Sequence, residues 1–236
     1  ELAKEAGFPD GVFNIVTGSA KEIGMELTKN PKVKKISFTG STEVGKILME
    51  QSASTVKKMS MELGGHAPFI VFDDADIDEA VTGALQSKFR NSGQTCICTN
   101  RLFVHESVYD NFLEKFTNEV KKIKVGNGLD DGTVSGPLID KSSLEKVIEH
   151  VQDAVNVGAK IAVGGDVHPL GGNFYQPTVL SNVSTEAKIT FEETFGPVAP
   201  IYKFSSDEEV IKKANNTPYG LASYFYSRDI GRIWRV

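Results

Sequence analysis

The sequence predicts an α/β protein with a parallel or mixed sheet. Short apolar runs of strand length alternate along the chain with segments whose apolar residues recur at helical spacing, which is the arrangement of βαβ units. With 236 residues, 40 % of them hydrophobic and 24 % charged, the chain has the composition of a globular protein and can bury one sizeable core or two modest ones. No internal repeat or low-complexity tract interrupts the alternation.

Seven segments have the length and pattern of strands. Each is a short run of apolar or alternating residues beside Gly, Pro, Asn, Asp or Ser, the residues that favour turns. In chain order they are 11–16, 33–38, 56–61, 69–72, 101–105, 161–163 and 221–226. The Gly196-Pro197 turn is expected to lead into a further strand.

Helices are expected between these strands. Asp74, Asp76 and Glu79 are expected to begin the helix that precedes the cysteines, and Ser107 is expected to cap the next one. Ser142 or Ser143 is expected to begin the helix after that. The first helical pattern ends at Gly7. The others cover 23–27, 47–49, 80–85, 108–120, 144–155, 207–215 and 229–236. Since the first has no start signal and the last no stop signal, we expect a fragment cut through helices at both ends.

Composition and charge exclude several classes of partner. A net charge of −5 argues against nucleic acid and anionic membrane surfaces, and no run approaches the roughly 18 apolar residues of a membrane span. Two cysteines so close together are not an extracellular disulfide framework, which favours a reducing compartment. The histidines show no paired ligand spacing, so no metal site is expected; they are His66, His105, His150 and His168.

The two cysteines lie in a small polar loop, 89–98, after a predicted helix. Cys96 is the candidate nucleophile. An unperturbed thiol is only about 3 % thiolate at pH 7, so a reactive cysteine needs neighbouring donors or positive charge. Arg90 and the amides of this Gly-containing loop are suited to supply both. The alternative is that Cys96 and Cys98 are small buried hydrophobes.

A glycine turn at 39–46 is the first of three further candidate sites. A strand, a Gly-turn and a helix in succession point backbone amides and a helix N-terminus at a phosphate. Gly40 and Gly45-Lys46 have the Walker A spacing, but Ile47 stands where Ser or Thr would hold Mg²⁺. The turn is not a G-x-G-x-x-G motif either. The alternative is a plain helix entry.

The other two sites are acidic turns. Glu62, just before Gly64-Gly65 and between two predicted strands, is expected at a strand end, where open α/β sheets place their sites. Glu193 and Phe195, before the Gly196-Pro197 turn, are suited to hydrogen-bond a sugar and to stack on a ring. A loop charge and a strand entry are the respective alternatives.

Taken together, four segments resemble the aldehyde dehydrogenase superfamily in order and spacing, across essentially the whole chain. They are Phe38-Thr39-Gly40-Ser41-Thr42-Glu43-Val44-Gly45, Met61-Glu62-Leu63-Gly64-Gly65, Gly93-Gln94-Thr95-Cys96 and Glu193-Thr194-Phe195-Gly196-Pro197. Arg90 within 88–98, together with 62–72 and 222–226, looks most like the succinate-semialdehyde dehydrogenase branch. The resemblance implies the end of a Rossmann-type nucleotide domain over 1–63 and most of an α/β catalytic domain over 64–236, truncated at its end.

The resemblance also implies a role for each candidate residue. Cys96 would attack the aldehyde carbon while its own amide helps to hold the oxyanion, and Glu62 would be the general base. Arg90 would pair with the distal carboxylate of a semialdehyde. Cys98 would be able to form a reversible disulfide with Cys96 that acts as a redox switch. The residues that would hold NAD or NADP are Thr39, Gly40, Ser41, Val44, Gly45, Leu63, Glu193 and Phe195.

Family members are roughly twice as long as this chain, so the resemblance implies a longer parent protein that forms a homodimer or homotetramer in the cytoplasm or the mitochondrial matrix. The expected partner is a small semialdehyde, and the fragment alone is expected to be inactive. Another semialdehyde, such as glutarate semialdehyde, is the alternative substrate. A thiol hydrolase using His66 or His105, and a catalytically silent fragment, are alternatives of other classes.

Overall fold

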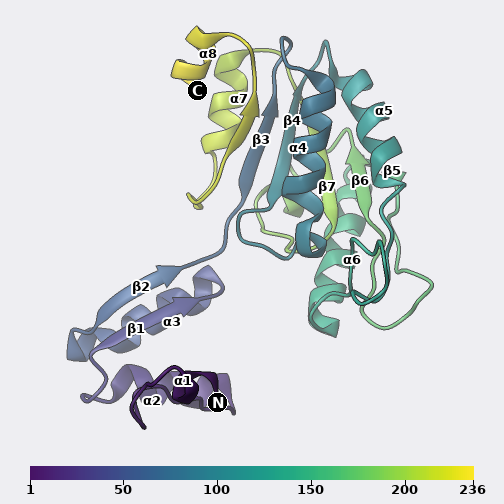
Figure 1. Ribbon diagram of the computed structural model, residues 1–236. Helices are drawn as coiled ribbons and strands as arrows, with labels where there is room; N and C mark the ends of the chain where they lie inside the picture. Colours follow the sequence, from purple (N-terminus) through teal and green to yellow (C-terminus); the bar gives the residue numbers. More distant parts are fainter. The chain divides into compact units, whose positions relative to one another are not determined.

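The computed structural model of the protein describes all residues, 1–236, which divide into two compact units, Glu1–Leu63 and Gly64–Val236 (Figure 1). None of the helices combines the length and the apolar character that crossing a membrane requires.

The first unit is built around one βαβ element. Strands β1 and β2 pair in parallel, with Thr39 opposite Glu62, and helix α3 makes the connection between them. Ser41 begins α3 because its side chain accepts a hydrogen bond from the Val44 amide. The elements are α1 (Leu2–Glu5), α2 (Ala20–Lys29), β1 (Lys35–Thr39), α3 (Thr42–Ser52), η1 (Ala53–Thr55) and β2 (Lys58–Glu62).

The second unit contains a six-stranded sheet in the order β5-β6-β7-β4-β3-β8. All neighbouring strands are parallel except β5 and β6, so the sheet is mixed. The strands are β3 (Ala67–Val71), β4 (Thr99–His105), β5 (Lys160–Val163), β6 (Thr178–Ser181), β7 (Val198–Phe204) and β8 (Tyr224–Tyr226). The predicted α/β class with a parallel or mixed sheet is confirmed.

Helices cover both faces of this sheet (Figure 1). Because successive strand residues point to opposite faces, Phe69 packs with helices α4 and α5, whereas Ile70 packs with α6 and α7. The two apolar clusters therefore form the two halves of a three-layer core. The helices of this unit are α4 (Ile77–Phe89), η2 (Arg90–Gly93), α5 (Tyr109–Val120), α6 (Lys141–Asn156), η3 (Lys188–Thr190), α7 (Asp207–Asn215) and α8 (Ile230–Arg235).

Three local predictions are wrong. Residues 11–16 form no strand, because neither strand of the first unit pairs with them, and their apolar side chains are exposed. Ser107 does not cap α5, because its hydroxyl bonds to the Nδ1 atom of His105. Helix α6 is capped by Asp140, whose carboxylate accepts from the Ser143 amide, so the helix begins earlier than either serine.

Candidate active site

The loop that carries both cysteines is shaped by three successive residues in the left-handed region. Asn91, Ser92 and Gly93 have φ values of 52°, 56° and 75°, immediately after α4 ends. The Asn91 side chain donates a hydrogen bond to the Gln94 carbonyl at 3.0 Å and so closes the turn locally. Two of the three residues are not glycine, so the conformation costs energy and needs support from its surroundings.

That support comes from the segment 135–139. The hydroxyl of Ser92 bonds to the hydroxyl of Ser135 and donates to the carbonyl of Gly136, both at 3.0 Å. The Gln94 side chain accepts from the Ile139 amide at 2.9 Å. The segment between α5 and α6 therefore supports the cysteine loop.

Cys96 is half-buried and Cys98 is buried, and both are free thiols. The Cys98 thiol donates to the Arg90 carbonyl at 3.8 Å, while the Tyr224 hydroxyl donates to the Ile97 carbonyl at 2.8 Å. Tyr224 therefore fixes the loop between the two cysteines from strand β8, a role that the sequence analysis did not assign. No local signal marks it, because its partner is 127 residues away.

The Arg90 side chain is exposed on the same loop. Partial burial raises the pKa of the Tyr224 hydroxyl, and the nearby positive charge of Arg90 opposes that rise. Because Arg90 is exposed, its guanidinium is accessible to an anionic group.

Gly65 connects the cysteine loop with the turn that carries Glu193. Its amide donates to the Glu193 carboxylate at 3.1 Å, and a Cβ built on it would lie 2.1 Å from the Cys96 carbonyl oxygen. Gly93 makes the second close approach, since its Cβ would lie 2.1 Å from the Gly196 carbonyl oxygen. The structure thus brings the loop that carries Cys96 and the turn that carries Glu193 together, at two close approaches where Gly65 and Gly93 leave no room for a Cβ.

Lys88 is a buried cation behind this site that the sequence analysis missed. Its side chain is fully buried and its ammonium donates to the Asn100 side chain at 3.0 Å, which in turn donates to the Gly65 carbonyl at 3.5 Å. Burial lowers the pKa of Lys88 to about 8, and the nearby Cys98 and Glu193 groups oppose that shift. On a helix the residue reads as an ordinary surface lysine, so only the fold reveals it.

The first unit places its predicted site residues at the carboxyl end of the β1–β2 pair. The Gly40 amide donates to the Glu62 carbonyl at 3.0 Å, next to the start of α3. Gly45 is buried, and a Cβ there would lie 2.5 Å from a methyl carbon of Leu63. The residues left exposed at this edge are Thr39, Ser41, Val44 and Glu62.

Neither histidine proposed for a thiol hydrolase bonds to Cys96. The Nε2 atom of His66 bonds to the Thr190 carbonyl at 2.8 Å, and its Nδ1 atom has no hydrogen-bond partner. Burial lowers the pKa of His66 to about 3, helped by the charge of Arg101. His105 bonds to Ser107. No observation therefore favours a cysteine–histidine pair.

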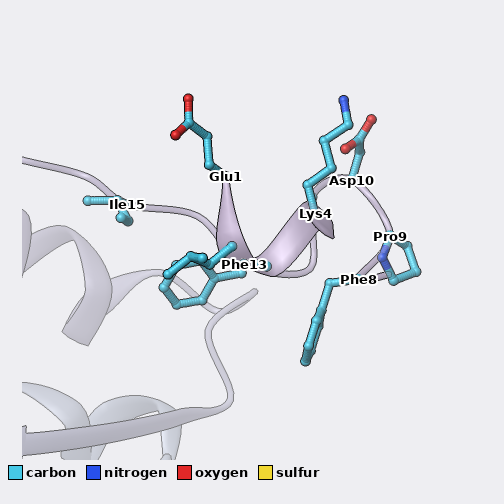
Figure 2. Close-up of a pocket in the computed structure, with 10 residues that line it drawn as sticks. Glu1, Lys4, Phe8, Pro9, Asp10, Phe13 and Ile15 are labelled. Carbon is cyan, nitrogen blue, oxygen red and sulfur yellow. The ribbon is translucent and has the colours of Figure 1, made fainter. Parts of the chain in front are cut away.

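Two surface hollows are lined by none of the residues predicted for the dehydrogenase site. One, of about 630 Å³, is formed by the first residues of the chain, with Phe8, Phe13 and Ile15 among its lining (Figure 2). The other, of about 350 Å³, lies beside β3 and β4. It is lined by His66, Arg101 and several residues between 214 and 223. The chain contains no group of three or more His, Cys, Asp or Glu side chains that could hold a metal ion.

Cys96 is a half-buried thiol on a loop that the surrounding segments support, and this loop lies beside the turn that carries the Glu193 carboxylate. These features define a cysteine-centred site in an α/β unit. The sequence profile described as "Aldehyde dehydrogenase family" matches residues 1–236. The chain belongs to the aldehyde dehydrogenase family.

Individual relatives agree with this assignment. The chain is 58 % identical over 236 residues to "Succinate-semialdehyde dehydrogenase [NADP(+)] GabD" of Escherichia coli strain K12, covering 100 % of this chain and 49 % of that protein. It is 56 % identical over 236 residues to a glutarate-semialdehyde dehydrogenase of Pseudomonas aeruginosa, with 100 % and 49 % covered. The crystal structure of succinate-semialdehyde dehydrogenase from Burkholderia pseudomallei matches with a TM-score of 0.98 and 56 % identity, covering 99 % of this chain and 48 % of that one.

The chain therefore spans about half the length of the relatives it matches. The expected resemblance to the aldehyde dehydrogenase superfamily is confirmed, and relatives named succinate-semialdehyde dehydrogenase are among its matches.

Proposed function

We propose that this chain is part of a dehydrogenase that oxidises succinate semialdehyde to succinate with NAD or NADP. The observation that carries the proposal is the contact of Gly65 with both the Cys96 carbonyl and the Glu193 carboxylate, because it holds the loop that carries the thiol beside the turn that carries a group suited to bind a ribose. A relative at 58 % identity carries the name of this activity and of NADP.

The residues present fit a nicotinamide dinucleotide. The first amides of α3 have no partner within the helix apart from the one that Ser41 caps, and Thr39, Ser41 and Val44 are exposed beside them. Gly45 is packed against Leu63, so the helix start lies close to the strand end. These residues would hold the pyrophosphate, and the Leu63 carbonyl would lie near the carboxamide. Glu193 would hydrogen-bond to the nicotinamide ribose, with Phe195 beside the ribose. When bound, the nicotinamide supplies the acceptor for a hydride.

Cys96 begins the proposed reaction. Its thiolate attacks the aldehyde carbon to form a thiohemiacetal, and its own backbone amide donates to the resulting oxyanion. Loss of hydride from that carbon leaves a thioacyl group on Cys96. Glu62 then removes a proton from a water molecule, which attacks the thioacyl carbon, releases the carboxylic acid and restores the thiolate.

Arg90 would select substrates with a distal carboxylate. Its guanidinium is exposed on the cysteine loop, and its planar fork matches a carboxylate with two parallel hydrogen bonds. One arginine fixes the carboxylate but not the chain length. Glutarate semialdehyde is therefore the second candidate substrate, favoured by a relative of that name at 56 % identity.

Domain roles, assembly and regulation complete the proposal. Residues 1–63 would end the dinucleotide-binding domain and 64–236 would form most of the catalytic domain, within a homodimeric or homotetrameric parent protein. Because relatives are about twice as long, the isolated chain is expected to be inactive. Cys98 would switch the parent off by forming a disulfide with Cys96.

The test is a steady-state assay of the full-length protein with succinate semialdehyde and with glutarate semialdehyde, following cofactor reduction with NAD and with NADP in turn. A clear preference for succinate semialdehyde, abolished in Cys96→Ala, is expected. Preference for glutarate semialdehyde supports the second candidate, and cofactor reduction that survives in Cys96→Ala contradicts the mechanism.

A further inference from the structure

The turn 192–196 holds its shape against local strain. Phe195 has a φ of 52°, the left-handed region that a bulky aromatic residue rarely adopts. Such a residue persists only where its surroundings determine its conformation. Glu193, two residues earlier, takes its orientation from the same turn.

Helix α6 provides these surroundings. A Cβ added to Gly196 would lie 2.4 Å from the Val147 side chain, so the helix packs directly on the turn. Lys146 donates to the Glu193 carbonyl at 2.6 Å. Next on the same face is His150, only 1 % exposed, with its ring against the turn.

His150 makes two hydrogen bonds to the turn. Its Nδ1 atom is 3.1 Å from the hydroxyl of Thr194, and its Nε2 atom is 3.3 Å from the carboxylate of Glu192. Thr194 is itself 2 % exposed, and no other hydrogen bond of its hydroxyl replaces this one. Water therefore has no access to take the place of the ring.

The chemistry of the partners fixes the tautomer. Burial lowers the pKa of His150, with a further contribution from Lys146, so the ring is neutral near pH 7 and carries one N–H. A carboxylate can only accept, so Nε2 donates to Glu192 and Nδ1 accepts from the Thr194 hydroxyl. Both bonds of the ring are thereby directed to residues on either side of Glu193.

We propose that His150 is a positioning residue that holds the 192–196 turn, through Thr194, in the conformation in which Glu193 binds the nicotinamide ribose, an inference that rests on the proposed function. His150 bonds to Thr194 and Glu192 of the turn and does not act on the reacting atoms. Its loss should weaken cofactor binding and leave the intrinsic reactivity of Cys96 unchanged.

The experiment compares His150→Phe, Thr194→Val and the double variant of the full-length protein. The dissociation constant of NADP is measured by titration without aldehyde, and the alkylation rate of Cys96 by iodoacetamide is measured without cofactor. Each single variant is expected to weaken NADP binding about five- to tenfold, the effect of one buried hydrogen bond. The double variant should bind NADP no more weakly than His150→Phe alone, because the bond that Thr194→Val removes is already lost in His150→Phe. Alkylation should stay within about twofold of the wild type in all three.

Matched controls and a rescue separate positioning from general damage. Thr82→Val and His168→Phe make the same chemical changes outside the turn and are expected to leave NADP binding unchanged. His150→Asn, whose amide oxygen can accept from Thr194, should recover most of the affinity. If His150→Phe does not fold, Thr194→Val keeps the shape of the side chain and tests the same bond.

Amide hydrogen exchange at 192–196 gives a readout that needs no cofactor, and it should be faster in both single variants than in the wild type. Unchanged NADP binding, additive losses in the double variant, or unchanged exchange in the turn overturns the role of His150. Failure of the wild type to bind either NAD or NADP overturns the proposed function instead, and with it the cofactor role of the turn.

Discussion

The α-carbon of Gly65 lies so close to the Cys96 carbonyl that an added Cβ would stand 2.1 Å from the oxygen. The amide of the same residue donates to the Glu193 carboxylate at 3.1 Å. A residue without a side chain therefore helps to set the distance between the loop that carries the thiol and the turn that carries the carboxylate.

Gly65→Ala should displace the cysteine loop, because a backbone oxygen cannot move aside as a flexible side chain can. A shift of about 1 Å at reacting groups costs on the order of 10²-fold in rate. We expect kcat/KM of the full-length protein to fall by about that factor. Gly128→Ala is the control, since a Cβ there meets no atom within 4 Å. Equal activity of the two variants would show that the contact does not position Cys96.

Arg90→Ala should raise KM for succinate semialdehyde much more than for an uncharged aldehyde of similar size. A hydrogen bond between charged groups contributes about 1.5–3 kcal/mol, so an increase of roughly 10- to 100-fold is expected for the semialdehyde. Arg90→Lys should recover the affinity only in part, because it lacks the planar fork. Equal increases for both aldehydes would remove Arg90 from substrate binding.

Cys98→Ala should protect the enzyme from reversible inactivation by hydrogen peroxide. In the wild type, two thiols and one peroxide molecule would give a Cys96–Cys98 disulfide and two water molecules, and a dithiol would reverse the reaction. Only one residue separates the two cysteines, so the ring would be strained and easily reduced. Inactivation and recovery that are identical in the variant would exclude the switch.

Lys88→Met should change the pH dependence of stability. The pKa of Lys88 falls from its ordinary 10.5 to about 8 on folding, so the unfolded chain binds more protons between these values. The stability of the wild type therefore rises with pH across this window. Below about pH 8, burying the charged Lys88 side chain destabilises the folded protein by the full amount, roughly 3 kcal/mol. The variant has no such cost.

The measurement is the free energy of unfolding of both full-length proteins at about pH 7.5 and about pH 10. We subtract the free energy of unfolding of the wild type from that of the variant at each pH. This difference should be larger at about pH 7.5 than at about pH 10, by about 2 kcal/mol. The comparison cancels every group that the two proteins share. A difference independent of pH would mean that Lys88 is not buried as a cation.

Local sequence signals were sufficient for elements whose ends are fixed locally. Helix α7 begins and ends at the predicted Asp207 and Asn215, because Ser206 caps it and acidic residues fill its first turn. The strand expected at 11–16 failed because an apolar run does not supply a pairing partner. Strand β6, residues 178–181, was not predicted because it is buried throughout and shows no alternation.

The candidate site divides in the same way. The motifs marked Cys96 and Glu193 as candidates, but the residue that contacts both, Gly65, could be recognised only as part of a glycine pair. His150, Lys88 and Tyr224 act through partners far away or through burial, and neither is visible in a local pattern. The assignments of catalytic and cofactor-binding roles remain predictions.

The most direct test of the proposed mechanism is to trap the intermediate on Cys96. The full-length Glu62→Gln variant is mixed with succinate semialdehyde and NADP, quenched, and digested for mass spectrometry. We expect a succinyl adduct on the peptide that contains Cys96, with cofactor reduction that stops after about one equivalent because hydrolysis is blocked. An adduct at another residue, or no adduct with turnover as fast as in the wild type, would contradict the assignment of Cys96 as nucleophile and Glu62 as base.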